Sequence, residues 1–310
     1  MKRFLTTLSA LLLCVALLAQ GKVNTRKYRF SDFTDKVTQV VTSGNEVLGG
    51  ALRQEVVNHW RSSAFEFCTL EQFEALKTSD QYYFLIVAES RFKDEEMPGI
   101  TFLTLAKGGP EAKDGIGSMD ELISLPLMAA MGGSGREYVY LGALIQAVQD
   151  FALAAMESEK AAYQRDGWFN ERYAKTAKMK QIYLSQEDLA PSANNAKLEQ
   201  YLDDDFHLCT EEEADAVYLS RSFNALVGYV VAPVLPDKGS YCYKLLFEAD
   251  TQRLLGADYC VVRGDTWRSA SNVDTATADT LRIRGIGNMV TSIVITGAQV
   301  KSFMIFSIDL

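Results

Sequence analysis

The hydrophobic positions of this chain follow two different periods along its length. Over residues 137–163, apolar residues recur every three or four positions, which predicts one long helix with a single buried face. That face consists of Leu141, Leu144, Ile145, Val148, Phe151, Ala152 and Ala155. Short apolar runs rich in strand-forming residues, each bounded by turn residues, lie on both sides of this helix. The pattern predicts mixed sheets with packed helices, an α+β or α/β fold.

Two stretches of the chain share the same order of predicted elements. Residues 65–69 (FEFCT) are echoed by residues 206–210 (FHLCT), with Cys68 matching Cys209. After each match come a helix-like stretch (70–77 and 211–220), an apolar strand (82–89 and 227–235), a turn with glycine, and another strand (100–106 and 241–248). We therefore predict an internal duplication of a strand–helix–strand–strand unit, whose last two strands pair as an antiparallel hairpin.

The predicted elements divide the chain into four parts. Residues 1–21 form a leader, and residues 22–165 form a first α/β unit that opens with a helix at 45–60 and closes with the long helix. Residues 166–203 are polar and are expected to form a helical linker. Residues 204–310 form the second, repeat-related unit.

The leader has the layout of a secretory signal peptide. Lys2 and Arg3 precede an uncharged apolar run over 4–19, and Ala19 and Gly21 are small residues suited to cleavage. The run is shorter than the roughly 20 residues that span a bilayer, and no later stretch predicts a transmembrane segment. We expect a soluble, exported protein, either periplasmic or secreted.

Composition and charge narrow the classes of partner. The chain is 48% hydrophobic, enough for a sizeable core, and its net charge is −9, or −11 once Lys2 and Arg3 are removed with the leader. Nucleic acids and anionic membrane surfaces bind clustered Lys and Arg, so this acidic chain predicts neither as a partner.

The mature chain keeps four cysteines, Cys68, Cys209, Cys242 and Cys260, and none forms a CxxC pair that would suggest a zinc or redox site. The hairpin over 241–262 leaves two registers open. In one register Cys242 faces Cys260, which would permit a disulfide in an oxidising compartment. In the other register Glu248 pairs with Arg253, and the two cysteines do not meet.

The best local candidate for ligand binding is the loop Gly132-Gly133-Ser134-Gly135-Arg136, which follows a predicted strand and precedes the long helix. Backbone N–H groups at Gly133, Ser134, Gly135 and Arg136, together with the helix dipole, could bind an anion there. The loop matches neither a P-loop nor a dinucleotide fingerprint. The alternative is a flexible turn in which Ser134 caps the helix.

No catalytic or metal-binding motif is complete. The only histidines are His59 and His207, and the acidic runs at 203–205 and 211–213 lack the spacing of a calcium loop. We therefore assign no catalytic residue, metal or cofactor.

The expected function is a non-enzymatic binding or structural module that recognises a protein, a surface component or a small ligand. The alternative is an exported hydrolase that uses carboxylates which the sequence does not single out.

Overall fold

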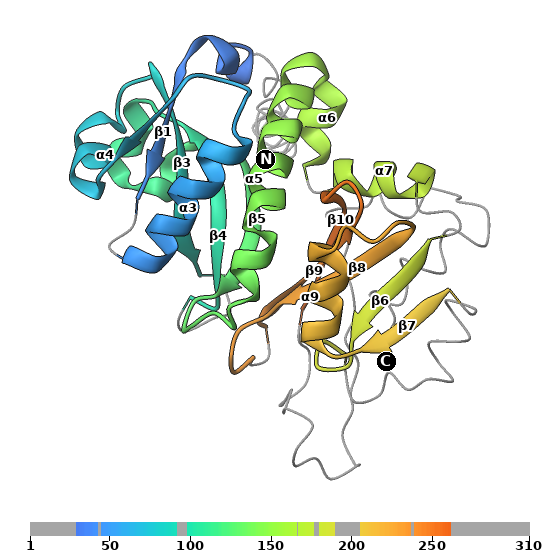
Figure 1. Ribbon diagram of the computed structural model, residues 1–310. Helices are drawn as coiled ribbons and strands as arrows, with labels where there is room; N and C mark the ends of the chain where they lie inside the picture. The colour runs from blue at the N-terminus through green and yellow to red at the C-terminus, as the bar shows by residue number, and fades with distance from the viewer. Residues whose placement is uncertain are drawn as a thin grey trace, which may run out of the picture.

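The computed structural model describes residues 29–42, 45–91, 98–165, 167–176, 180–189, 205–236 and 239–261 of the 310-residue chain. The predicted signal peptide and residues 262–310 lie outside this part. Figure 1 shows two units side by side, each with its own sheet, and helix α5 (Arg136–Glu157) next to both. Each unit holds a five-stranded mixed sheet with helices packed on it. The predicted fold class is confirmed.

The first sheet combines a parallel half and an antiparallel half. Its strands are β1 (Val37–Val41), β2 (Phe65–Cys68), β3 (Tyr82–Ser90), β4 (Ile100–Lys107) and β5 (Asp120–Ala129), in the order β2-β1-β3-β4-β5. β1 pairs in parallel with β2 and β3, whereas β3, β4 and β5 form an antiparallel meander. A 3-10 turn (Phe33–Asp35) precedes β1.

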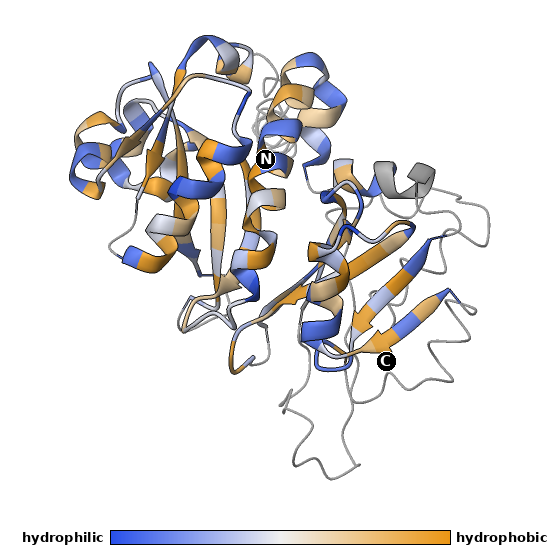
Figure 2. Ribbon diagram, in the orientation of Figure 1, coloured by the Kyte–Doolittle hydropathy of each residue, from blue (hydrophilic) through white to orange (hydrophobic). Residues whose placement is uncertain are grey.

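Helices cover both faces of the first sheet. Alternate residues of β3, such as Leu85 and Ile86, belong to two separate hydrophobic clusters because successive side chains point to opposite faces. The larger cluster contains residues of α3 (Glu46–His59) and α5, and the smaller one contains residues of α4 (Leu70–Leu76) and of the 3-10 turns Pro110–Asp114 and Ile116–Ser118. In Figure 2 the strands of both sheets and the length of α5 are largely hydrophobic.

The second unit follows two shorter helices, α6 (Glu159–Gln164) and α7 (Gly167–Thr176). Its elements are β6 (Gln181–Ser185), β7 (Phe206–Cys209), α9 (Glu211–Leu219), β8 (Ala225–Val231), β9 (Tyr241–Glu248) and β10 (Arg253–Val261). The strand order is β7-β6-β8-β9-β10, with β6 parallel to β7 and β8 and the last three strands antiparallel. This topology is the same as that of the first sheet.

The two sheets agree in register as well as in order. Phe65 pairs with Thr38, and its counterpart Phe206 pairs with Ile182. Both units carry a β-bulge at the same step between their last two strands, where one extra residue, Leu122 or Leu255, has no partner opposite. The similarity therefore extends beyond the stretch in which the sequence match was found, and the registers differ only where β5 has a second bulge, at Leu127, within the described residues.

The matching cysteines occupy the same place in both units. Cys68 and Cys209 are buried at the ends of β2 and β7, and a threonine follows each of them. Thr69 and Thr210 both form a capping box with the third residue of the next helix, which fixes where α4 and α9 begin. A short FxxCT string thus marks a strand end and a helix start in each unit.

Each unit contains one strand that the sequence pattern did not predict. These strands are β1 and β6, and they are the same element, the central strand of the parallel half. β6 lies within residues 166–203, so the segment predicted as a helical linker contains α7 and then the first strand of the second unit. Both strands have only five residues, and short apolar runs of that kind do not distinguish strand from helix.

The predicted long helix is interrupted near its end. α5 ends at Glu157 and α6 begins at Glu159, because Ser158 has an extended backbone and its side chain accepts a hydrogen bond from the Ala161 N–H. The predicted apolar face of α5 is buried throughout. Among the described helices, α5 is long and apolar enough to cross a membrane, but 67% of that apolar stretch is buried inside the protein, as in the core helix of a globular protein.

The hairpin of β9 and β10 contains both of the registers that the sequence left open. Near the turn Glu248 pairs with Arg253, and beyond the bulge at Leu255 the backbone of Cys242 faces that of Cys260. The expectation that one register excludes the other was wrong. The bulge adds one residue to β10, which shifts the pairing by one position.

If the protein is exported, as its leader predicts, this pairing predicts a Cys242–Cys260 disulfide, since directly opposed Cα atoms in antiparallel strands lie about 4.5–5.5 Å apart, within the range of disulfides. The bond would contribute about 3 kcal/mol on the chain-entropy estimate. Thiol labelling of the mature protein, unfolded without reductant, should modify Cys68 and Cys209 alone. Labelling of all four cysteines would exclude the bond.

Candidate functional site

Arg136, the first residue of α5, is buried and contacts the second unit. Arg136 is only 5% exposed. Its Nε and NH2 groups donate to the carboxylate of Asp215 on α9 over 3.0–3.2 Å, and its NH1 group lies 3.1 Å from both Asp188 and Glu211. One cation from the first unit thus binds three carboxylates from the second, in the forked geometry that suits guanidinium.

One helical turn later, Tyr140 reinforces the same contact. Its ring stacks on Tyr229 and Phe247 with centroids 4.6 and 4.8 Å apart, and its hydroxyl donates to Asp215 over 2.7 Å. The guanidinium of Arg136 lies 5.2 Å from the centre of the Tyr229 ring. Because residues four apart share one face of a helix, Arg136 and Tyr140 contact the second unit together, beside a hydrophobic core that is continuous between the two units.

The charges in this network do not balance. Burial raises the pKa of Asp188 to about 7, an effect that the nearby Glu211 carboxylate adds to and that Arg136 only partly offsets. Asp215 accepts hydrogen bonds from the Nε and NH2 groups of Arg136. Asp188 and Glu211 therefore share the remaining NH1 group. An additional cation near Asp188 would therefore be stabilised.

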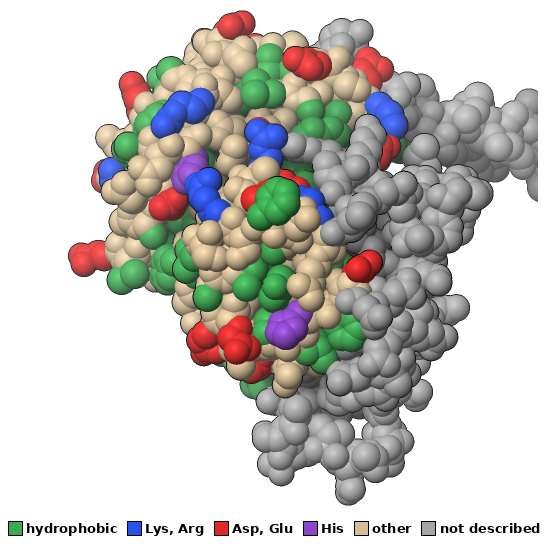
Figure 3. All heavy atoms as spheres, turned by 45° about the vertical axis from the view of Figure 1, so that its right-hand side comes forward, with side chains coloured by type: hydrophobic (Ala, Val, Ile, Leu, Met, Phe, Trp, Pro, Cys, Tyr) green, Lys and Arg blue, Asp and Glu red, His purple; other side chains and the backbone are tan. Residues whose placement is uncertain are grey.

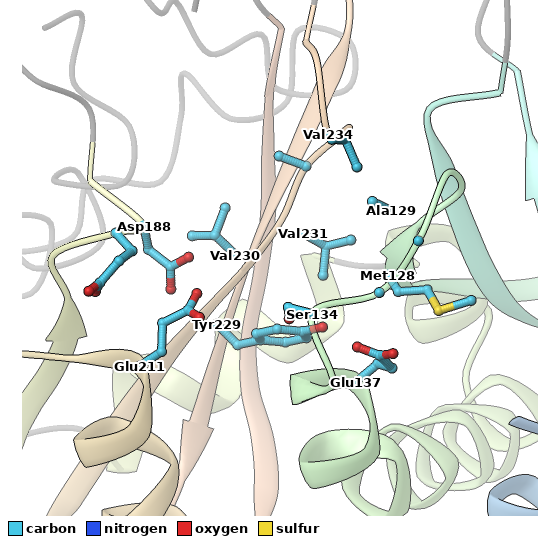
Figure 4. Close-up of a pocket in the computed structure, with 14 residues that line it drawn as sticks. Met128, Ala129, Ser134, Glu137, Asp188, Glu211, Tyr229, Val230, Val231 and Val234 are labelled. Atoms are coloured by element: carbon cyan, nitrogen blue, oxygen red, sulfur yellow. The ribbon is translucent and has the colours of Figure 1, made fainter. Parts of the chain in front are cut away.

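An open pocket of about 280 Å³ lies beside this network, between the two units. Its lining is Met128, Ala129, Gly132, Gly133, Ser134, Glu137, Glu187, Asp188, Glu211, Tyr229, Val230, Val231, Ala232 and Val234. Four of these residues carry a carboxylate, and no Lys or Arg is among the described residues that line it. Figure 4 shows the Asp188 and Glu211 carboxylates on one side, Glu137 on the other, and the Tyr229 ring between them. We call this site the acidic pocket.

The topology of the second sheet explains where the acidic pocket forms. After β6 the chain passes to one side of that strand to form β7, and then crosses to the other side to form β8. Glu187 and Asp188 follow the end of β6, and Tyr229 and Val230 lie near the end of β8. In sheets of this strand order, ligands bind at the carboxyl ends of the two strands where the direction of winding reverses. The acidic pocket occupies that position.

Glu137 is the buried acid on the other side of the pocket. The residue is 3% exposed, and within the described part of the chain its one hydrogen bond comes from the Gly135 N–H to Oε2, over 2.8 Å. A Cβ atom at Gly133 would collide with this carboxylate, so the loop needs glycine there. The second carboxylate oxygen, Oε1, accepts no hydrogen bond from the described residues.

The predicted anion loop contributes to the lining of the acidic pocket, and two of its four N–H groups, those of Gly135 and Arg136, already have acceptors within the protein. The Gly135 N–H binds Glu137, and the side chain of Arg136 binds the three carboxylates of the second unit. The N–H of Arg136 lies 3.4 Å from the Ser134 hydroxyl, but the N-cap of α5 is Gly135, so Ser134 does not occupy the capping position expected for it. An added anion would face four carboxylates, so we do not carry the anion hypothesis forward.

The other residues considered from sequence do not form a reactive site. Burial raises the pKa of the Cys209 thiol to about 11, and Glu213 adds to this effect, so the thiol is not activated. His59 pairs with Glu55 on α3, and His207 packs near Tyr183. Nowhere in the described ranges do three or more His, Cys, Asp or Glu side chains form a group that could hold a metal ion.

A second hollow, of about 250 Å³, differs in charge from the acidic pocket. It is lined by Arg29, Phe30, Met119, Asp120, Glu121 and Arg165. Its acids and bases pair with each other, Arg29 with Asp120 and Arg165 with Glu121. It therefore offers no excess charge to a ligand.

Comparisons with known proteins add no further assignment, since no protein-family model, curated protein or solved structure matches this chain significantly.

The network predicts that Asp215→Ala destabilises the protein by about 1–3 kcal/mol, because the Arg136 Nε and NH2 groups and the Tyr140 hydroxyl lose their acceptor while Asp188 and Glu211 still pair with the guanidinium. Glu212→Ala is the matched control, since Glu212 is an exposed acid on the same helix. Urea unfolding measures both variants. Equal stability of the two would show that the contacts of Asp215 do not stabilise the protein.

The raised pKa of Asp188 predicts a distinct pH dependence. The folded protein retains a proton on Asp188 that the unfolded chain releases near pH 4, so this residue makes stability fall as pH rises from about 4 to 7. Asp188→Asn should remove that decline, and Glu212→Gln should leave it unchanged. Urea midpoints measured at intervals across this range test the difference. Parallel profiles for wild type and Asp188→Asn would contradict the assignment.

Proposed function

We propose that this protein is a non-enzymatic binding module whose ligand is an organic cation held in the acidic pocket. The observation that carries the proposal is the charge of the lining, which holds four carboxylates. Two of them, Asp188 and Glu211, share the one guanidinium of Arg136 with Asp215. A cation with an apolar stem suits the lining, because Val230, Val231 and the Tyr229 ring lie among the acids. Export, which the leader predicts, would place this binding outside the cytoplasm.

The negative surface charge of the second unit also favours a positively charged ligand. On the face shown in Figure 3, acidic side chains gather at the lower end of the second unit, with no Lys or Arg side chain visible beside them. The first turn of α9 contributes Glu211, Glu212 and Glu213 to the charge of this unit. Such a field attracts cations and raises their rate of association.

One observation favours the alternative function, a hydrolase. Asp188, with its pKa near 7, shares the pocket with Glu211, and two carboxyl groups in different environments can serve as acid and base. We prefer binding because both groups contact Arg136, and a guanidinium contact weakens a carboxylate as a base. Turnover of chromogenic glycosides or esters that is lost in Asp188→Asn and retained in Glu212→Gln would replace the binding proposal.

Agmatine, a four-carbon chain with a guanidinium and an ammonium group, is a suitable probe. Calorimetry should detect its binding at pH 8. Glu137→Gln should weaken it about ten- to hundredfold, because an interaction with a charged group contributes about 1.5–3 kcal/mol. Glutamine can still accept the Gly135 N–H, so this variant removes the charge and keeps the loop contact.

The control is Glu212→Gln, which removes one negative charge from α9 outside the pocket lining and should leave agmatine affinity unchanged. Binding should also weaken as pH falls below 7, because Asp188 then becomes neutral, and Asp188→Asn should abolish this dependence. If Glu137→Gln and Glu212→Gln bind agmatine equally, the acidic pocket is not the site.

A further inference from the structure

Three exposed apolar residues either line the acidic pocket or adjoin a lining residue in the chain. Met131 is 79% exposed, Val234 58% and Leu235 81%. Met131 immediately precedes Gly132, a lining residue in the loop between β5 and α5, and Leu235 follows Val234, a lining residue after β8. We call these three residues the apolar rim, and they come from both units. Figure 4 shows Val234 above the acids, across from Ala129.

The rim and the pocket together favour a larger occupant than a free cation. A small amine would contact the carboxylates and leave the rim in water, whereas exposed apolar groups around a polar centre are typical of protein contact sites. At about 280 Å³ the pocket is smaller than the roughly 300–1,000 Å³ of sites for drug-sized ligands. It has room for one long side chain with a charged end.

We propose that the natural occupant is an arginine or lysine side chain of a partner polypeptide, whose neighbouring apolar residues lie on the apolar rim. This inference rests on the proposed binding of cations and adds the class of ligand. A basic side chain inserted among carboxylates and surrounded by apolar contacts has the features of an interface hot spot. The buried Glu137 carboxylate, with one hydrogen bond at Oε2, would gain a charged donor at Oε1.

The negative charge of the acidic pocket favours a basic partner. The mature chain is expected to carry −11, and the pocket concentrates four acids at the junction of the two units. A polypeptide with a basic residue between apolar residues matches both the charge and the rim, and electrostatic attraction speeds such an encounter. Anionic surfaces, by contrast, would be repelled from this mouth.

The test compares agmatine with three blocked pentapeptides in calorimetric titrations against the full mature protein. The peptides are acetyl-Ser-Leu-Arg-Leu-Ser-amide, the same peptide with neutral citrulline in place of arginine, and acetyl-Ser-Ser-Arg-Ser-Ser-amide. The Leu-Arg-Leu peptide should bind about tenfold or more tightly than agmatine, and the citrulline peptide should lose about tenfold or more. The Ser-Arg-Ser peptide should bind no better than agmatine.

Variants of the rim separate this inference from the proposed function. Met131→Ser and Leu235→Ser should each weaken the Leu-Arg-Leu peptide about threefold or more and leave agmatine unchanged. Val57→Ser is the control, since Val57 is 52% exposed on α3 and does not line the pocket. Circular dichroism and urea unfolding confirm that each variant is folded.

Two outcomes overturn the proposals separately. If agmatine and the Leu-Arg-Leu peptide bind equally and the rim variants change neither, the occupant is a free cation and the polypeptide proposal is wrong, while cation binding stands. If Glu137→Gln binds both probes as tightly as Glu212→Gln does, cation binding in the acidic pocket fails, and the polypeptide proposal fails with it.

Discussion

The burial of Arg136 against three carboxylates of the second unit is the interaction on which the acidic pocket depends. A buried guanidinium is costly unless carboxylates surround it, so the first turn of α5 is held against α9 wherever the second unit is folded. The stacked rings of Tyr140, Tyr229 and Phe247 exclude water from the same contact. Arg136 and Tyr140, on one face of α5, therefore contact the same carboxylate of the second unit.

The acidic pocket follows from this contact in two ways. Docking α5 against the second unit brings the β5–α5 loop, with Glu137, to the carboxyl ends of β6 and β8. It also buries Asp188 beside a second carboxylate, Glu211. Burial and this neighbouring charge raise the pKa of Asp188, and the contact with Arg136 offsets only part of the increase. The duplicated fold provides two sheets of the same topology, and the site forms at the one whose strand ends carry Glu187 and Asp188.

Much of the fold could be predicted from sequence, and less of the site. The FxxCT strings, the apolar face of α5 and the short apolar runs of the strands are local patterns, so the duplication and the fold class could be inferred from them. β1 and β6 were missed because five residues carry too little periodicity. The residues of the site come from separate segments, with Glu137, Asp188 and Glu211 brought together by the topology. No spacing along the chain signals that meeting, and a glycine-rich loop before a helix suggested an anion because Glu137 was not seen to fill it.

The most direct test of the account is a crystal structure of the mature protein with agmatine bound. The guanidinium or ammonium group of agmatine should lie within hydrogen-bond distance of Glu137, with the apolar stem near Val230 or Val231. Arg136 should still be bound to Asp215. A ligand bound elsewhere while the pocket remains empty, or two units arranged without the Arg136–Asp215 contact, would contradict it.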